Sequence, residues 1–298
     1  MSTPPTGAYS PKLDNMVGVL WMLAAVFSLT AMFTILKQMT TELPVFVVAI
    51  MRTFVALLFM TPWLMRAGLS ALATTRMRMH FLRSFFGIAA FACVMYALSK
   101  LLLSDTMVLS FTTPFWSIIV SALMLGEVIR RYRTIATIVG FFGVILIVKP
   151  QAGIDPAMLV ALLGALLTSG AMISMKSLSR TEPPNRIVFL FFLYGTLILL
   201  PVAAITWQTP NLTQIGWLVL AGFLGTIGQI FLARAYSAAD VTVVAPFDFI
   251  RLPLAALFGF VFLSETPDIW SGLGTLIIIG ASLYIARREA GDRARKTG

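Results

Sequence analysis

The two halves of the chain repeat one pattern of small, apolar, proline and acidic residues. In the first half Pro114 lies thirteen residues before Glu127, and in the second half Pro253 lies twelve residues before Glu265. Matching segments accompany these pairs: Tyr96 and Tyr236, Asp105-Thr106 and Asp240-Val241, Leu125-Gly126 and Leu263-Ser264, Gly140 and Gly274. Each copy holds five apolar stretches, an odd number, so the second copy must enter a membrane from the opposite face. Inverted repeats of this kind build alternating-access carriers with a substrate site near the bilayer midplane.

The apolar stretches predict the fold class. The 298 residues are 59% hydrophobic and 11% charged, whereas soluble domains are about 25% charged. A spanning helix needs about 20 apolar residues. The candidate stretches are 17–36, 45–64, 81–98, 106–125, 134–148, 157–175, 187–206, 214–233, 241–263 and 269–286. We therefore expect an all-α integral membrane protein of ten transmembrane helices, arranged as two inverted five-helix repeats.

The connections between these stretches are short and leave no room for a folded extramembrane domain. We expect a cytoplasmic tail at 1–14, a first repeat at 15–150, a second, inverted repeat at 151–286, and a basic cytoplasmic tail at 287–298. The first fifteen residues are polar and lack a cleavage signature after the first apolar stretch, so we expect no signal peptide.

The distribution of basic residues predicts the orientation. If the N-terminus is cytoplasmic, 17 of the 22 lysines and arginines fall on the cytoplasmic side, and only Lys37, Lys100 and Lys149 fall on the opposite side. This is the positive-inside bias of membrane proteins, and it predicts that both termini are cytoplasmic. The net charge of +10 therefore reflects topology, and we expect no nucleic-acid partner.

Catalytic and cofactor chemistry finds little support in the sequence. A phosphate-binding loop requires a lysine directly after a glycine, and none of the six lysines of this chain follows a glycine. Cys93 and His80 are each the only residue of their kind, so no Cys/His cluster has metal-ligand spacing. We expect a protein that is not an enzyme and that needs no cofactor and no metal.

Three ionisable residues lie well inside apolar stretches, away from their ends: Arg52, Asp248 and Arg251. A charge at the centre of a membrane helix costs about 2.5–3.5 kcal/mol on insertion scales, so such groups face protein or a water-filled cavity. Asp248 and Arg251 are three residues apart and close enough to pair. Two interpretations stay open: an internal salt bridge that fixes the ninth helix, or an arginine and a carboxylate that bind the two charges of a zwitterionic solute.

Prolines and aromatic residues add further candidates in the fourth and ninth stretches. Pro114, Pro246 and Pro253 each remove a helical hydrogen bond and are candidate hinges, with a simple packing kink as the alternative. Nearby aromatic rings could line a cavity for flat apolar solutes or for cations. The candidate substrate-binding residues are Arg52, Tyr96, Phe111, Trp116, Phe247, Asp248 and Arg251.

The two repeat blocks, each with an apolar run followed by Gly126-Glu127 or Ser264-Glu265, resemble the EamA domain of the drug/metabolite transporter superfamily. The resemblance covers residues 17 to 286. Lys37 and Lys176 fall at matching places of the two copies. Arg52 looks like the arginine common in the second span of such domains, and Phe192 lies near that place in the second copy.

The resemblance implies a transporter of small metabolites, most similar to bacterial exporters of aromatic and neutral amino acids. We expect a secondary transporter in the bacterial inner membrane that takes amino acids or amines as substrates and needs no obligate protein partner. The alternatives are a multidrug or quaternary-amine exporter and, from a different class, a passive pore or a lipid-handling scaffold. A pore requires rings of polar side chains along a continuous path, and the stretches show few.

Overall fold

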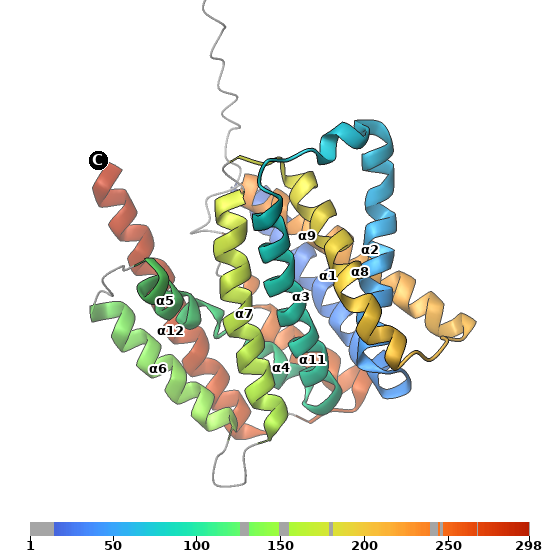
Figure 1. The fold of residues 1–298 in the computed structure, drawn as a ribbon. Coiled ribbons are helices and arrows are strands. Elements are labelled where there is room, and N and C mark those ends of the chain that lie inside the picture. The colour runs from blue at the N-terminus through green and yellow to red at the C-terminus, as the bar shows by residue number, and fades with distance from the viewer. Residues whose placement is uncertain are drawn as a thin grey trace, which may run out of the picture.

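The computed structural model describes residues 15–125, 131–148, 155–178, 181–238, 244, 247–266 and 268–297. Every element that it describes is a helix (Figure 1). The first copy of the repeat contains α1 (Asn15–Glu42), α2 (Val45–Ala67), the short 3-10 helix η1 (Leu69–Leu72), α3 (Met77–Lys100), α4 (Leu103–Ser110), α5 (Thr113–Leu125) and α6 (Arg131–Val148). The second copy contains α7 (Pro156–Leu178), α8 (Pro184–Ile205), α9 (Leu212–Ala238), α11 (Arg251–Leu263) and α12 (Ile269–Thr297).

Seven helical stretches in this described part are long and apolar enough to cross a membrane: Met16–Glu42, Val45–Ala67, Met77–Lys100, Leu103–Val120, Pro156–Met175, Asn185–Ile205 and Leu212–Leu232. Three shorter apolar helices occupy the remaining expected stretches, at Thr134–Val148, Arg251–Leu263 and Ile269–Ile285. The prediction of an all-helical, multi-pass membrane protein is confirmed for the described residues, and the count of ten spans stays a prediction.

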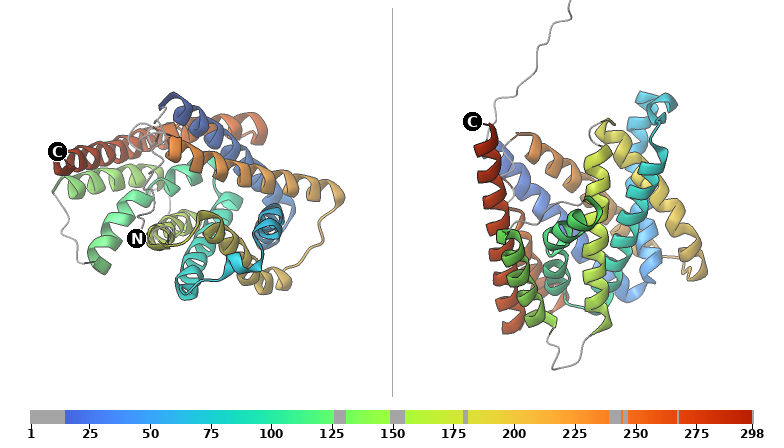
Figure 2. Two further views of the ribbon diagram at one scale, coloured as in Figure 1. Left: turned by 90° about the horizontal axis from the view of Figure 1, so that it is seen from above. Right: turned by 60° about the vertical axis from the view of Figure 1, so that its left-hand side comes forward.

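The helices of the two copies exchange partners. The first helix of one copy packs against the third of the other, since α1 packs on α9 and α3 packs on α7. Helices at equal places in the two copies also pack on each other, as α2 does on α8 and α6 on α12. Figure 2 shows α6 beside α12 at one side of the molecule. This reciprocal pattern of contacts is the one that two copies related by a two-fold axis would make.

The α6–α12 contact brings the two backbones together at small residues. A Cβ atom added to Gly143 would lie 2.9 Å from the carbonyl oxygen of Gly274, and one added to Gly274 would lie 2.6 Å from that of Gly143. Glycine at both places therefore permits the close approach that membrane helices often use.

The fourth apolar stretch is broken and not continuous. α4 ends at Ser110, and α5 begins at Thr113, so Pro114 is the second residue of a new helix. Proline lacks the N–H that would bond to the Ser110 carbonyl, and the hydroxyl of Thr113 donates to that carbonyl instead, at 2.7 Å. Leu103–Val120 as a whole stays long and apolar enough to cross a membrane, but a turn at residues 111–112 interrupts it. Pro114 therefore lies in the first turn of a helix, where a proline is tolerated.

A corresponding break lies in the ninth stretch. Residues 249–250 form a turn before α11, and Pro253 is the third residue of that helix. The Phe249 carbonyl accepts the N–H of Leu252 at 3.0 Å. The two breaks meet, since the ring centroids of Phe111 and Phe249 are 5.1 Å apart. Pro246 lies outside the described residues, and whether the prolines act as hinges stays a prediction.

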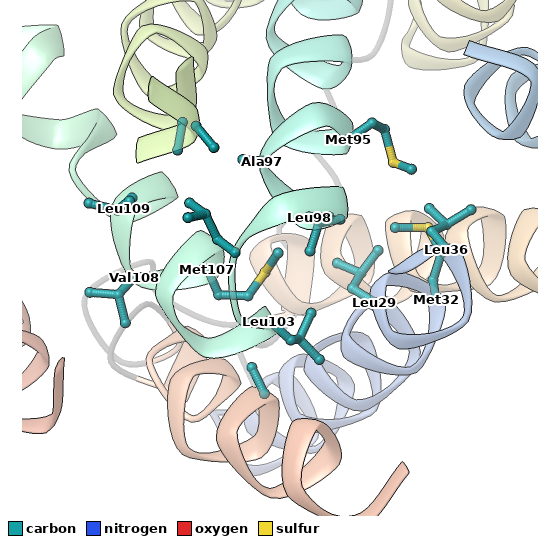
Figure 3. Close-up of a cluster of buried hydrophobic side chains, with 14 of the residues drawn as sticks. Leu29, Met32, Leu36, Met95, Ala97, Leu98, Leu103, Met107, Val108 and Leu109 are labelled. Carbon is teal, nitrogen blue, oxygen red and sulfur yellow. The ribbon is translucent and has the colours of Figure 1, made fainter. Parts of the chain in front are cut away.

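The largest buried apolar cluster among the described residues draws on most of the helices, and Figure 3 shows a part of it with side chains of α1, α3 and α4. Leu36 of α1, Met95 and Leu98 of α3, and Leu103 and Met107 of α4 are all buried. This cluster packs the short helix α4 against α1 and α3, next to the interior arginine described below.

Candidate substrate site

Arg52 occupies the buried face of α2. Val48, Ala49, Arg52 and Val55 recur at helical spacing, and all four are buried against neighbouring helices. The guanidinium therefore lies inside the protein, with the residue only 7% exposed. A charge on this face of α2 is held among apolar groups, where water cannot solvate it.

Four helices contribute to the surroundings of Arg52. Its guanidinium carbon lies 5.0 Å from the ring centroid of Phe91 on α3 and 5.6 Å from that of Phe192 on α8. Its Nη2 contacts the sulfur of Met32 on α1 at 3.6 Å. A Cβ atom added to Gly225 of α9 would lie 3.0 Å from Nη2, so this glycine leaves the room that the guanidinium occupies. We call these four residues and Arg52 the arginine cage.

No carboxylate forms an ion pair with Arg52 in the part of the chain that the structure describes. The Nε atom of Arg52 is buried and has no hydrogen-bond partner there. Cation–π contacts attract a guanidinium by about 0.5–2 kcal/mol, but the Nε–H donor still lacks an acceptor and Nη2 has only the weakly accepting sulfur of Met32. An anionic group of a bound molecule would supply the missing acceptors, so the cage has the chemistry of a carboxylate or phosphate site.

Asp248 and Arg251 form an ion pair with each other. Nη2 of Arg251 lies 2.6 Å from Oδ1 of Asp248, and the side chains are 16% and 26% exposed, respectively. The guanidinium carbon of Arg251 also lies 5.8 Å from the ring centroid of Phe111. The geometry agrees with the salt-bridge interpretation. The Asp248 carboxylate is thus engaged within its own chain segment.

The other aromatic candidates make no ring contact with the cage among the described residues. Tyr96 on α3 is 41% exposed. Trp116 packs edge-on against Phe141 of α6, with 5.2 Å between ring centroids. Phe247 packs against the small buried cluster of Met22, Val26, Ala235 and Val244. Of the candidates, the structure brings Phe111 and Arg251 together, and none of the described aromatic or cation–π contacts joins them to Arg52.

Both copies of the repeat match a known family model. The EamA-like transporter family matches residues 16–149 and again residues 155–287. The chain belongs to the EamA-like transporter family. Its resemblance to the drug/metabolite transporter superfamily is thereby confirmed, and the chain is a multi-pass membrane transporter with two EamA repeats.

Relatives of this EamA-like transporter differ in what they carry. It is 30% identical over 286 residues to the S-adenosylmethionine uptake transporter of Rickettsia bellii, covering 94% of this chain and 97% of that one. It is 34% identical over 281 residues to the riboflavin transporter of Rhizobium johnstonii, covering 92% of each. It is 30% identical over 277 residues to the pseudopaline exporter CntI of Pseudomonas aeruginosa, covering 92% of this chain and 97% of that one.

A solved crystal structure superposes on this EamA-like transporter with a TM-score of 0.63. The two share 17% sequence identity, and the superposition covers 92% of this chain and 99% of the other. At this identity the likeness concerns the fold alone.

Several residues of the cage in this EamA-like transporter were not selected from the sequence. Met32, Phe91 and Gly225 give no signal by themselves, because apolar and small residues occur all around their helices. The sequence indicates Phe192 only as the residue near the place of Arg52 in the second repeat. Asp105 is a carboxylate buried in the first turn of α4, where negative charge is favoured, and the sequence indicates it only as part of the repeat.

A polar cluster holds together two connections of this EamA-like transporter, between α2 and α3 and between α7 and α8. The carboxylate of Glu182 accepts hydrogen bonds from Thr74 at 2.5 Å and from Arg186 at 2.6 Å. His80 Nε2 lies 3.8 Å from the same carboxylate. Burial alone raises the pKa of the Glu182 carboxyl, but the hydrogen bonds from Thr74 and Arg186 outweigh it and hold that pKa below its usual range. The cluster ties the first repeat to the second at one end of the molecule.

Proposed function

We propose that this EamA-like transporter is a secondary transporter that exports aromatic and neutral amino acids and related small metabolites across the bacterial inner membrane. The observation that carries the proposal is the arginine cage. An arginine that is 7% exposed, whose guanidinium lies over two phenylalanine rings and has no carboxylate partner among the described residues, is suited to the carboxylate of an amino acid.

Alternating access follows from the repeat. In this proposal the chain has ten spans, the second repeat is inverted, and both termini are cytoplasmic. The exchange of helix partners between the copies supports a two-fold relation. The matched breaks at Phe111 and Phe249, whose rings touch, give each copy a discontinuous helix near the centre. Discontinuous helices at the repeat interface are where carriers of this kind hold their substrates.

The chemistry of the cage favours a carboxylate with an apolar side chain. Phe91 and Phe192 offer ring faces and edges to a substrate, and Met32 adds a polarizable sulfur. S-adenosylmethionine, the substrate named for one relative, is itself an amino acid with a free carboxylate. A quaternary amine is a weaker candidate, because Arg52 repels cations and the Asp248 carboxylate is paired with Arg251.

Purified protein in liposomes tests this proposal. Vesicles preloaded with unlabelled phenylalanine should take up external radiolabelled phenylalanine by counterflow, with a rate that saturates, because a carrier binds one substrate per cycle. Unlabelled leucine should compete, whereas phenylalaninamide, which lacks the carboxylate, should not. A flux that rises linearly with concentration and does not saturate would indicate a pore. If phenylalaninamide competes as well as the amino acids do, the transporter does not recognise the carboxylate.

The topology has its own test, which rests on the charge distribution. Reporter domains joined after residue 298 or inserted near residue 180 should read cytoplasmic, and one inserted near residue 209 should read external. The positive-inside bias is the physical reason. An external reading at the C-terminus would contradict both the count of ten spans and the inversion.

A further inference from the structure

An ion pair joins the end of α1 to the segment that follows α11. Nζ of Lys37 lies 2.5 Å from Oε1 of Glu265, and the two side chains are 13% and 9% exposed, respectively. Lys37 belongs to the first repeat and Glu265 to the second. The contact therefore couples the two halves of the transporter.

The same two side chains also hold the connection between α3 and α4. Nζ of Lys37 donates to the carbonyl of Leu101. The second oxygen of Glu265 accepts the N–H of Leu103, the first residue of α4, at 2.8 Å. A free N–H at a helix N-terminus favours a carboxylate. Three segments, α1, the α3–α4 connection and the end of α11, thus meet at one ion pair, at the lower end of the molecule as drawn in Figure 1.

The local backbone directs Glu265 into this position. Ser264 has a left-handed conformation with φ of 55°, which costs a residue other than glycine roughly 1–2 kcal/mol. The N–H of Glu265 then donates to the carbonyl of Gly259 at 2.9 Å. A Cβ atom added to Gly259 would lie 2.7 Å from Oε2 of Glu265, so this glycine leaves space for the carboxylate.

The ion pair lies between the arginine cage and one end of the molecule. Lys37 follows Met32 by five residues of α1, which is about 7.5 Å along the helix, and Met32 contacts Arg52. Leu36, which precedes Lys37, is fully buried. Arg52 itself is eight residues from Pro44, about 12 Å from the same end of α2. The contacts of Lys37 and Glu265 therefore join α1, the α3–α4 connection and the end of α11 between the cage and this end.

We propose that Lys37 and Glu265 form a latch that closes this end of the transporter and that separates whenever the cage opens toward it. An ion pair suits a reversible closure, because water can solvate both charges once they part. On the charge distribution this end faces the outside. The proposal rests on the alternating access proposed above.

A reducible crosslink tests the latch. The variant carries Cys93→Ala, Lys37→Cys and Glu265→Cys. A bifunctional thiosulfonate reagent that spans the two positions then joins the two introduced thiols. Because opening requires these segments to separate, crosslinking should lower phenylalanine counterflow by about tenfold or more, and reduction should restore it. A pair with a purely structural role would leave the crosslinked protein as active as the reduced one, which would overturn the proposal.

A matched pair at the same end serves as the control. Glu42 accepts a hydrogen bond from Gln214 at 2.8 Å, and these residues belong to α1 and α9, which pack along each other. Crosslinking Glu42→Cys to Gln214→Cys should leave counterflow unchanged. Equal inhibition by both crosslinks would show a general loss of mobility and would contradict a specific latch.

Chemical labelling gives a readout that does not depend on transport. Ser104, beside Leu103, is buried, and Ser104→Cys in the Cys93→Ala background reports access from this end. The reaction of this cysteine with a membrane-impermeant thiol reagent should be faster in Glu265→Gln. It should also be faster in Lys37→Met, a second variant that keeps the contact between Glu265 and Leu103. Glu42→Gln should leave the rate of labelling unchanged. Unchanged labelling in both latch variants would overturn the proposal. Failure of counterflow before any crosslinking would count against the proposed function, and labelling would then decide the latch alone.

Discussion

Replacement of Arg52 by glutamine is expected to lower the phenylalanine counterflow rate constant by roughly 10- to 100-fold, because a hydrogen bond to a charged group contributes about 1.5–3 kcal/mol. The same change should leave the protein at least as stable, since it removes a buried cation that has no anionic partner among the described residues. Counterflow in liposomes and thermal unfolding in detergent measure the two effects. Arg52→Lys keeps the positive charge but loses the bidentate geometry of the guanidinium. Its counterflow rate constant should therefore lie between those of the unchanged protein and of Arg52→Gln.

Arg83 provides the matched control for this substitution. Its guanidinium carbon lies 4.5 Å from the ring centroid of Phe191, so it makes the same kind of cation–π contact on a neighbouring part of α3 and α8. Arg83→Gln should leave the apparent affinity for phenylalanine unchanged. If Arg52→Gln transports normally, or if both variants lose affinity to the same extent, the cage is not the carboxylate site.

The ion pair of Asp248 and Arg251 is expected to behave as a structural unit. Loss of one partner from a fully buried pair costs about 3–5 kcal/mol, because the other charge is left unpaired. The side chains here are 26% and 16% exposed, so solvent screening should reduce the cost for Asp248→Asn or Arg251→Gln to about 1–3 kcal/mol. The double variant should recover most of this loss.

A double-mutant cycle on thermal stability and on counterflow separates the two interpretations of this pair. A double variant that is stable and active would leave both residues structural. A double variant that is stable but does not transport amino acids would instead assign them to substrate binding.

The sequence predicted the helices and the repeat well because both depend on composition and spacing. Arg52 could be selected because a charge in an apolar stretch needs a reason to be there. Phe91, Met32 and Gly225 could not be selected, since a helix that is apolar on all sides does not reveal which face meets protein and which meets lipid. Their role depends on the packing of four helices, which no local pattern encodes.

The prolines show a second limit of local patterns. A proline inside a long apolar stretch is compatible with a kink in one helix and with the start of another. Hydrogen bonds decide between them: the Thr113 hydroxyl satisfies the Ser110 carbonyl, and the next helix begins there. The threonines before Pro114 are the signal that could have indicated a break, because their side chains compete with the helical hydrogen bonds of the backbone.

The contact between Arg52 and Phe192 has a consequence for how such a transporter can be assembled. The two residues lie at nearly corresponding places of the two repeats and face each other where α2 packs on α8. In a homodimer of single-repeat subunits, an arginine at this place would face its own copy, and two positive charges would repel each other. Fusion of the two repeats into one polypeptide lets the halves diverge, so the centre can carry one charge opposite one ring. A solute with a single carboxylate then has one preferred way to lie there, which a symmetric pair of subunits could not provide.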